Sequence, residues 1–562
     1  MYPMKKLGFL AGLVLAANAH AAVETVPGEV LVKLKGTDKA ALKSVMNNVG
    51  ATLARTVKLS YGDVHVLKLD QKSNIKSVVK SLASDPSVEY AEPNFVYRAI
   101  VPEKEVNLQS LMAPLMQFGA PNDPKFGQLW GLDNTGENEP SRTQAGLVGA
   151  DVDAFKAWEI TKGSRAVKIA VIDTGIDYRH PDLKDNMLIN EAELNGTEGV
   201  DDDGNGFVDD IYGYDFAGKD GDPMDGHSHG THCAGTIGAT HDNGVGVAGV
   251  MSEVSFLAVK FLSDSGSGST ADAIAAIDYA TLRGVDIMSN SWGGGGYSEA
   301  LKEAIERASE AGILFTAAAG NSGSNNDQSP HYPSNYDVAN VISVAASTAQ
   351  DDLASFSCYG RRTVHIAAPG HRILSTTKNG GYAVYSGTSM ATPHVTGALG
   401  LLLAQEGRMP VAEVRERLMA TSEPVGALRG RTINSGRLNA YNLLTNTRPE
   451  RNEPNPSDWK TVALEQSWET SHPYGHNVNM ERTFNVPGAK FMRLKISKYD
   501  TEKNYDFISV KNASRQVVEK VSGKGEGHVT DYVEGDTIHA TFTSDRSVDA
   551  WGFVITEVEV QY

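Results

Sequence analysis

Ser389 lies in a segment whose residue types suit a nucleophile. The segment reads Gly387-Thr388-Ser389-Met390-Ala391-Thr392-Pro393-His394. The glycine allows a tight turn before the serine, and the apolar run over 395–404 predicts a buried helix behind it. Ser389 is therefore expected at a helix N-terminus, where free N–H groups and the helix dipole favour negative charge. A serine at a helix start is also a common N-cap, so other groups must decide.

Three further polar side chains lie at predicted strand ends and helix starts, where reactive groups of α/β proteins are commonly found. Asp173 ends the apolar run 167–172, which is typical of a buried parallel strand. His229 opens a segment of small residues that predicts another helix, and Asn321 follows a third apolar strand. Ligands of open α/β sheets bind at the carboxyl ends of the strands. An acid, an imidazole and a hydroxyl brought together there can perform nucleophilic catalysis.

The order of these residues along the chain, and the segments around them, are similar to those of a known protein family. Residues 120–445 resemble the subtilase family of serine proteases, in which the chain order is Asp, His, Ser. The resemblance implies Ser389 as the nucleophile, His229 as the general base and Asp173 as the group that orients the histidine. It implies Asn321 as a hydrogen-bond donor to the oxyanion.

Other reactive side chains lie near these positions in the sequence. Asp177, His232 and His394 are expected to be structural, because the resemblance assigns catalysis to their neighbours. Cys233 and Cys358 are the only cysteines, too few for a disulfide framework. A single bridge is the alternative, but two free thiols are expected, and the serine already fills the place of a nucleophile.

The same resemblance implies how a peptide substrate is held. One extended segment contains Ser291, Trp292 and Gly293, and the opposite one contains Ser267 and Gly268. A peptide between them would be bound by main-chain hydrogen bonds, as in strand addition.

A pocket for the side chain before the scissile bond is expected beside these segments. Its wall would be Ala318, Ala319 and Gly320, with Ser322 adjoining it and His331 near its base. These segments carry no carboxylate that would demand a basic side chain. A broad preference for apolar or aromatic residues is therefore expected.

An acidic run predicts a calcium ion. Asp201, Asp203 and Asn205 alternate and are followed by a glycine, as in the first half of an EF-hand loop. The twelfth residue of that pattern is a tyrosine, so Asp209 or Asp210 would have to close the site. A solvated acidic turn is the alternative.

The family resemblance implies a second calcium site, with ligands from three segments. They would be the side chains of Asp123, Asp182 and Asn243 and the carbonyls of Thr240, Val245 and Val247. In the family such ions pin loops beside the active site, and an ion that binds only the folded state stabilises it.

The start of the chain predicts export. Two lysines precede an apolar run from Leu7 to Ala17, and small residues follow, which indicates a bacterial signal peptide over 1–21. No other run approaches the roughly 20 apolar residues of a membrane span. The net charge of −18 argues against nucleic acid and anionic membranes as partners. We expect a monomeric secreted protein, with a periplasmic location as the alternative.

The chain order predicts a zymogen. Residues 22–98 resemble the subtilase propeptide, a small α+β domain that assists folding and then inhibits by placing its tail in the cleft. Residues 99–121 would be a linker cut during activation, although an N-terminal binding module is an alternative. Residues 122–445 would form an α/β domain, with a mostly parallel sheet covered by helices on both faces.

The C-terminal part of the chain differs in composition and in predicted secondary structure. A polar, proline-containing linker is predicted over 446–457, and an antiparallel β-sandwich over 458–562. The latter is similar to a CUB domain, although the cysteines of the animal form are absent. If so, Glu502, Asp506 and Asp545 would bind Ca²⁺, with ordinary surface carboxylates as the alternative.

The sequence thus predicts a secreted, calcium-stabilised serine endopeptidase that processes itself and acts through an acyl-enzyme. Its partners would be protein and peptide substrates and its own propeptide. Two other functions remain open. One is an inactive scaffold whose C-terminal domain binds a partner, which the four intact positions oppose. The other is a processing protease of narrow specificity.

Overall fold

The computed structural model describes residues 23–70, 72–100, 120–140, 145–451, 454, 458–503, 505–513, 515 and 517–562. The predicted signal peptide and most of the predicted activation linker lie outside these ranges. The chain divides into two compact units, Met1–Pro449 and Glu450–Tyr562. Among the described residues, none of the helices combines the length and apolar character that a membrane crossing requires.

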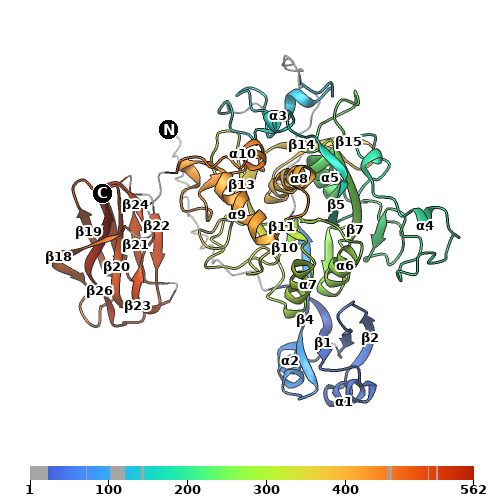
Figure 1. Ribbon diagram of the computed structural model, residues 1–562. Coiled ribbons are helices and arrows are strands. Elements are labelled where there is room, and N and C mark those ends of the chain that lie inside the picture. The colour runs from blue at the N-terminus through green and yellow to red at the C-terminus, as the bar shows by residue number, and fades with distance from the viewer. Residues whose placement is uncertain are drawn as a thin grey trace, which may run out of the picture. The chain divides into compact units, whose positions relative to one another are not determined.

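The N-terminal domain is a small antiparallel sheet with two helices (Figure 1). Its elements are β1 (Thr25–Leu34), α1 (Lys39–Val49), β2 (Thr52–Val57), β3 (Val64–Lys68), α2 (Ile75–Ala83) and β4 (Val88–Ala99). Strand alternation directs Val30 and Val32 to a core with the two helices. Leu31 and Val66 point to the other face and join a core of the following α/β domain. The sheet is therefore buried on both faces.

A nine-stranded sheet forms the centre of the next domain, in the order β16-β17-β13-β12-β11-β9-β5-β7-β6. All neighbours are parallel except β16 and β17. The strands are β5 (Gly163–Asp173), β6 (Gly213–Asp215), β7 (Glu253–Lys260), β9 (Ile287–Asn290), β11 (Leu314–Ala318), β12 (Val341–Ser347), β13 (Ile366–Pro369), β16 (Glu423–Pro424) and β17 (Gly436–Arg437). Their apolar runs fit strands that are buried on both faces.

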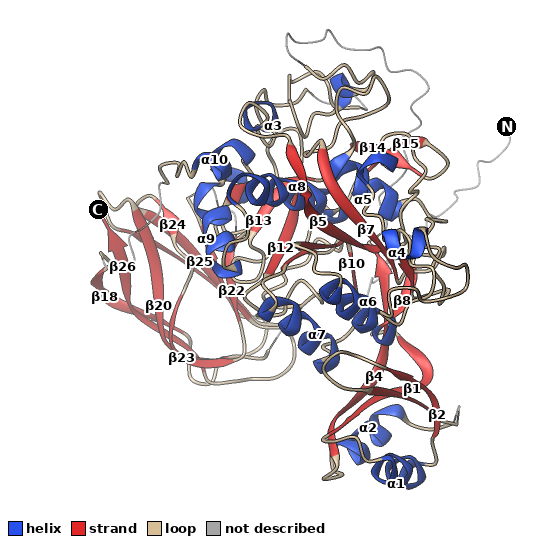
Figure 2. Ribbon diagram, turned by 45° about the vertical axis from the view of Figure 1, so that its right-hand side comes forward, coloured by secondary structure: helices blue, strands red, loops and turns tan. Residues whose placement is uncertain are grey.

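Helices cover both faces of this sheet (Figure 2). One apolar core contains α5 (His229–Gly238) and α8 (Thr388–Glu406), and the other contains α6 (Thr270–Leu282) and α7 (Glu299–Glu310). The remaining elements are η1 (Phe126–Gln128), α3 (Ala154–Ala157), η2 (Lys184–Asn186), α4 (Glu191–Leu194), β8 (Ser267–Ser269), β10 (Trp292–Gly293), β14 (Ile373–Thr377), β15 (Gly381–Tyr385), α9 (Val411–Thr421), η3 (Gly426–Leu428) and α10 (Ala440–Thr445). The predicted α/β architecture is confirmed.

The C-terminal unit consists of two antiparallel sheets around one apolar core. One sheet contains β18 (Lys460–Glu469), β20 (Phe491–Asp500), β23 (Lys524–Val529), β24 (Val533–Glu534) and β26 (Gly552–Gln561). The other contains β19 (Asn479–Asn485), β21 (Phe507–Lys511), β22 (Val517–Val521) and β25 (Thr537–Thr543). The predicted antiparallel β-structure of this region is confirmed.

Candidate active site

Asp173 and His229 are brought together by the end of one element and the start of another. Strand β5 ends at Asp173 and helix α5 begins at His229. The Oδ1 atom of Asp173 lies 2.7 Å from Nδ1 of His229, and both side chains are fully buried. Burial opposes the imidazolium, but the charge and hydrogen bond of Asp173 outweigh burial and raise the pKa of His229. This arrangement holds the imidazole with Nε2 free to act as a base.

Ser389 lies in the first turn of α8, two residues after the extended residue Gly387. Its Oγ donates to the carbonyl of Ser291 at 3.0 Å and to the carbonyl of Ile100 at 3.2 Å. The Ile100 carbonyl also faces His229 and contributes to raising the pKa of that imidazole. Within the described residues, Nε2 of His229 makes no hydrogen bond. The hydroxyl and the base therefore face the same carbonyl of the chain itself.

Asn321 is oriented by the residue before the serine. Its Oδ1 accepts from the backbone N–H of Thr388 at 2.9 Å and from the Thr388 hydroxyl at 3.0 Å. The amide nitrogen is consequently turned toward Gly387, where it lies 2.9 Å from the position that a Cβ would occupy. The Ile100 carbonyl oxygen lies 3.7 Å from that same position. The Asn321 amide nitrogen and the Ile100 carbonyl oxygen therefore both lie beside Gly387.

The two predicted extended segments hold a strand between them. Strand β4 pairs antiparallel with β8, where Tyr97 lies opposite Gly268, and with β10, where Ala99 lies opposite Trp292. The main chain continues this pattern, because the N–H of Ile100 donates to Ser291 at 3.3 Å. The predicted linker at 99–121 therefore begins inside the cleft, since the pairing with β8 and β10 extends to Ile100.

The residues of the predicted pocket wall are buried, and an imidazole lies at one end of the predicted pocket. Ala318, Ala319 and Gly320 are buried at the end of β11. A Cβ on Gly293 would lie 2.2 Å from Cε1 of His331, and one on Gly320 would lie 3.1 Å from its Cδ2. The ring of His331 therefore abuts the glycines of both walls. Burial lowers the pKa of His331 to about 4, so this end of the pocket is uncharged at neutral pH.

Comparison with known proteins decides the family. Residues 164–456 match the subtilase family, and residues 14–94 match the fervidolysin N-terminal prodomain. The thermophilic serine proteinase of Bacillus sp. (strain AK1) is 36% identical over 422 residues, which cover 75% of this chain and 88% of that protein. This chain belongs to the subtilase family. It is a subtilisin-like serine endopeptidase with an N-terminal prodomain.

Other relatives of this subtilase span different parts of the chain. Thermitase of Thermoactinomyces vulgaris is 38% identical over 290 residues, covering 52% of this chain and 92% of that protein. Halolysin of Haloferax mediterranei is 34% identical over 453 residues, covering 78% of this chain and 75% of that protein.

The neighbouring reactive groups of the subtilase have structural partners. The carboxylate of Asp177 accepts from backbone N–H groups, and the His232 ring stacks on Tyr385. Burial lowers the pKa of His232 to about 3 and that of His394 to about 4, so both rings are neutral at physiological pH. Both cysteines are free and buried, as expected.

Carboxylates cluster in the loop predicted to bind calcium, but Glu193 takes the place expected for Asp210. Oxygen atoms of Glu193, Asp201 and Asp203 all lie within 4.8 Å of one another. The buried Asp210, expected to close the site, is instead bound by Arg283 at 3.0 Å and by Tyr279 at 2.6 Å. Asn205 donates its side-chain amide to both Asp203 and Asp210. Glu193 on α4 was missed because it lies outside the alternating acidic run.

The second predicted calcium site also comes together. Asp182 accepts from the side chain of Asn243 at 2.9 Å and from the N–H of Val247 at 3.1 Å, and the N–H of Thr240 donates to its carbonyl. Asp123 is fully buried, and its Oδ1 has no hydrogen-bond partner within the described residues. Burial raises the pKa of Asp123 to about 6, and the nearby Asp182 acts in the same direction. An unpaired buried oxygen beside a second carboxylate fits a bound cation.

The three carboxylates predicted in the C-terminal unit lie together. Oxygen atoms of Glu502, Asp506 and Asp545 are all within 4.8 Å of one another. Asp506 is fully buried, accepts from the N–H of Asp545 at 2.8 Å and is also bound by the hydroxyl of Tyr474. Clustered hard oxygen donors of this kind suit Ca²⁺.

Proposed function

We propose that this subtilase is a secreted zymogen that first cleaves its own chain between Ile100 and Val101 and then cleaves other proteins. Asp173, His229 and Ser389 would form the catalytic triad, with Asn321 in the oxyanion hole. The observation that carries the proposal is the Ile100 carbonyl, which accepts a hydrogen bond from Ser389. A peptide bond whose carbonyl meets the nucleophile is the bond that this geometry would cleave first.

The chemistry follows from the positions of these groups. Oγ of Ser389 attacks the carbonyl carbon of Ile100 while His229 takes the hydroxyl proton at Nε2. Asn321 and the N–H of Ser389 donate to the oxyanion, and Asp173 stabilises the imidazolium. His229 then gives the proton to the amide nitrogen of Val101, and the amine leaves. Water hydrolyses the acyl-enzyme by the same steps.

The cleft supports a preference for apolar side chains before the scissile bond. Ile100, which lies at that position in the zymogen, is aliphatic and 9% exposed. The pocket segments carry no charge at neutral pH, because His331 is held neutral by burial. The substrate strand is held by the backbone of β8 and β10, which reads no side chain and favours broad specificity.

We propose Ca²⁺ as the stabilising cofactor. Three sites would hold it. One contains the side chains of Asp123, Asp182 and Asn243 and the carbonyls of Thr240, Val245 and Val247. Another is the Asp201 loop with Glu193, and the last contains Glu502, Asp506 and Asp545. The last of these also supports the CUB-like interpretation of the C-terminal unit. Bound ions would neutralise crowded carboxylates and stabilise the loops, and they take no part in the chemical steps.

The processing step can be tested by following the chain after expression without residues 1–21. The native protein is expected to yield a new N-terminus at Val101, and Ser389→Ala is expected to stay uncut. Ser386→Ala, a matched serine before the same helix, is expected to mature normally. A first cut at another bond, or self-cleavage of Ser389→Ala, would contradict the proposal. Labelling of Ser389 by a serine-directed phosphonate tests the nucleophile separately.

A further inference from the structure

A second buried carboxylate lies beside the proposed triad. Asp225 is 2% exposed and precedes α5. We propose that Asp225 is a positioning residue that joins the segment carrying Asp173 to the helix carrying His229. It would hold the imidazole in line with its partner and favour the imidazolium formed during catalysis. The inference rests on the catalytic roles proposed above.

Both oxygen atoms of Asp225 are bound to these two segments. Oδ1 accepts from the hydroxyl of Thr174 at 3.0 Å and from the N–H groups of His227 at 2.8 Å and Ser228 at 2.9 Å. Oδ2 accepts from the N–H of Thr231 at 2.9 Å and from its hydroxyl at 2.7 Å. One carboxylate thus binds residues on both sides of His229 and the residue that follows Asp173.

The hydroxyl of Thr174 extends the link. It accepts from the N–H of Gly230 at 2.9 Å, while the N–H of Thr174 donates to Oδ1 of Asp173 at 2.7 Å. Asp225, Thr174 and Asp173 therefore form a continuous set of hydrogen bonds around the catalytic histidine. A displacement of the His229 backbone relative to Asp173 would require several of these bonds to break.

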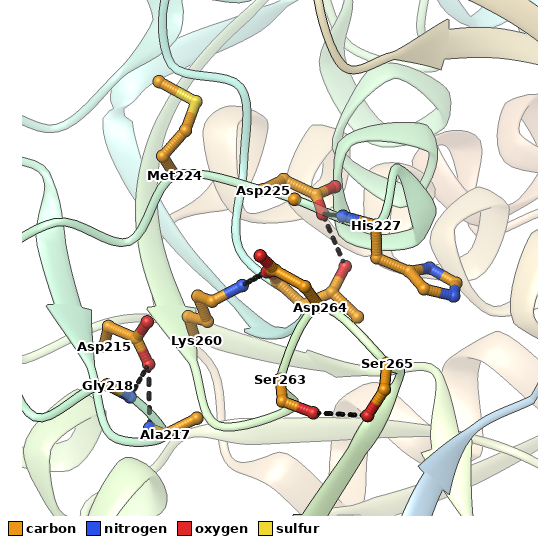
Figure 3. Close-up of polar contacts among 12 residues, drawn as sticks. Asp215, Ala217, Gly218, Met224, Asp225, His227, Lys260, Ser263, Asp264 and Ser265 are labelled. Carbon is orange, nitrogen blue, oxygen red and sulfur yellow. Dashed lines mark hydrogen bonds and ion pairs between the residues drawn. The ribbon is translucent and has the colours of Figure 1, made fainter.

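The loop that carries Asp225 is also fixed from its other side, next to Asp264, which Lys260 binds (Figure 3). A Cβ on Gly226 would lie 2.2 Å from Cγ of Asp264, so no larger side chain fits there without a shift. The Lys260 ammonium binds Asp264 and donates to the carbonyl of Thr174 at 2.8 Å. Lys378 donates to the carbonyl of Gly226. The carboxylate is consequently held in place rather than free to rotate away.

Within the described residues, Asp225 is bound by neutral donors and forms no ion pair. The donors include the first N–H groups around α5, where the helix dipole favours a negative charge. This charge acts on His229 in the same direction as that of Asp173 and raises its pKa. Asp225 therefore adds a second fixed negative charge near the imidazolium.

Other titratable groups also lie near His229, but they do not favour the imidazolium. His227 and His232 face it, and burial lowers the pKa of each, so both are neutral when His229 titrates. Burial raises the pKa of the Cys233 thiol, which stays protonated. The positive charge of Lys260 is compensated by Asp264, whereas Lys378 lies near His227. The two buried carboxylates, Asp173 and Asp225, are thus the groups that favour the imidazolium.

Asp225→Asn removes the charge and replaces one acceptor by a donor. We expect kcat to fall by about tenfold or more with KM nearly unchanged, because the base is no longer held in line. The general base must be neutral, so activity rises with pH through the pKa of His229. Loss of the Asp225 charge lowers this pKa, and the acid limb of the kcat/KM profile is expected to move to lower pH.

Two further variants separate the positioning effect of Asp225 from the effect of its charge on His229. Thr174→Val removes the bridging hydroxyl but no charge, so kcat is expected to fall while the acid limb stays in place. Asp177→Asn removes a neighbouring buried carboxylate that accepts from the backbone N–H groups of Arg179 and Gly380, and is expected to change neither. An acid limb and kcat of Asp225→Asn equal to those of the native enzyme would overturn the inference. So would equal losses in Asp225→Asn and Asp177→Asn that follow a fall in Tm.

The pH titration of the His229 Nδ1 proton, followed by NMR in the Ser389→Ala precursor, needs no activity. A lower pKa in Asp225→Asn supports the electrostatic role of Asp225 even if the enzyme proves inactive. An unchanged pKa contradicts that role. Failure of the native enzyme to react with a serine-directed phosphonate would instead overturn the proposed function, so the two failures can be distinguished.

Discussion

The N-terminal domain and the C-terminal unit are both small β-rich regions, but their sheets are used differently. Strand β4 pairs with β1 of the N-terminal domain, and its last residues pair with β8 and β10 of the protease. Its Glu92 binds the start of α7, and Asn94 binds the start of α6. The two C-terminal sheets contain only their own strands and enclose a core of their own residues.

This difference indicates that the N-terminal domain, but not the C-terminal unit, depends on the protease for its fold. Leu31 and Val66 of the N-terminal sheet belong to the same apolar core as α6 and α7. Removal of either partner would therefore expose apolar surface, and removal of the N-terminal domain would also take away the hydrogen bonds that Asn94 and Glu92 accept at the starts of α6 and α7. The C-terminal unit buries its apolar residues without such help. We expect the first region to fold together with the protease and the second to fold alone.

The largest effect is expected from deletion of residues 23–100. The yield of active protease should fall by orders of magnitude, because α6 and α7 lose the surface on which they pack. Active sites are counted by titration with a serine-directed phosphonate after refolding. Addition of the separate N-terminal domain should restore activity. A deletion variant that reaches full activity alone would show that the shared core is not needed for folding.

A smaller effect is expected from one ion pair between the domains. Lys33 is buried, binds Glu303 of α7 and lies over the ring of Tyr61. Lys33→Met leaves Glu303 without its ion-pair partner and, among the described residues, with only the Tyr90 hydroxyl bound to it, and is expected to cost about 3 kcal/mol, or a roughly 100-fold weaker inhibition by the N-terminal domain. The measurement is the inhibition constant against the mature enzyme. Lys35→Met, an exposed lysine on the same strand end, should leave it unchanged.

The smallest effect is expected in the C-terminal unit. Residues 458–562 expressed alone should unfold cooperatively, and Ca²⁺ at 100 times its Kd should add about 2.7 kcal/mol of stability. Asp506→Asn is expected to abolish the calcium-dependent rise in Tm, whereas Asp536→Asn, at a turn between strands, should keep it. The measurement is thermal unfolding with Ca²⁺ and with a chelator. If the native domain shows no such rise, the calcium assignment in this unit is wrong.

The catalytic residues were predictable because each lies in a local pattern. Asp173 ends an apolar run, His229 opens a helix of small residues, and Ser389 begins the helix behind a glycine. Period and residue type report such element ends directly. The structure places these ends together as expected, and the shared hydrogen bond between Asp173 and His229 supports their assignment.

Other residues were missed because their role depends on contacts between distant segments. Glu193 lies on a short helix and meets Asp201 and Asp203 only after the loop folds back. Asp225 stands in a turn with no periodicity, and its significance comes from bonds to Thr174 and Thr231. No pattern along the chain records which donors a carboxylate will meet.

The sequence by itself determined the α/β and antiparallel classes, and it predicted the order of the domains and the four residues proposed for the active centre. These follow from apolar periodicity and from motifs in which neighbouring residues act together. Only the tertiary structure decided that the pairing of β4 with β8 and β10 is continued as far as Ile100 and that the ring of His331 lies against Gly293 and Gly320. Strand pairing and side-chain contact join residues that are remote along the chain, so their ends and partners are set by the packed fold.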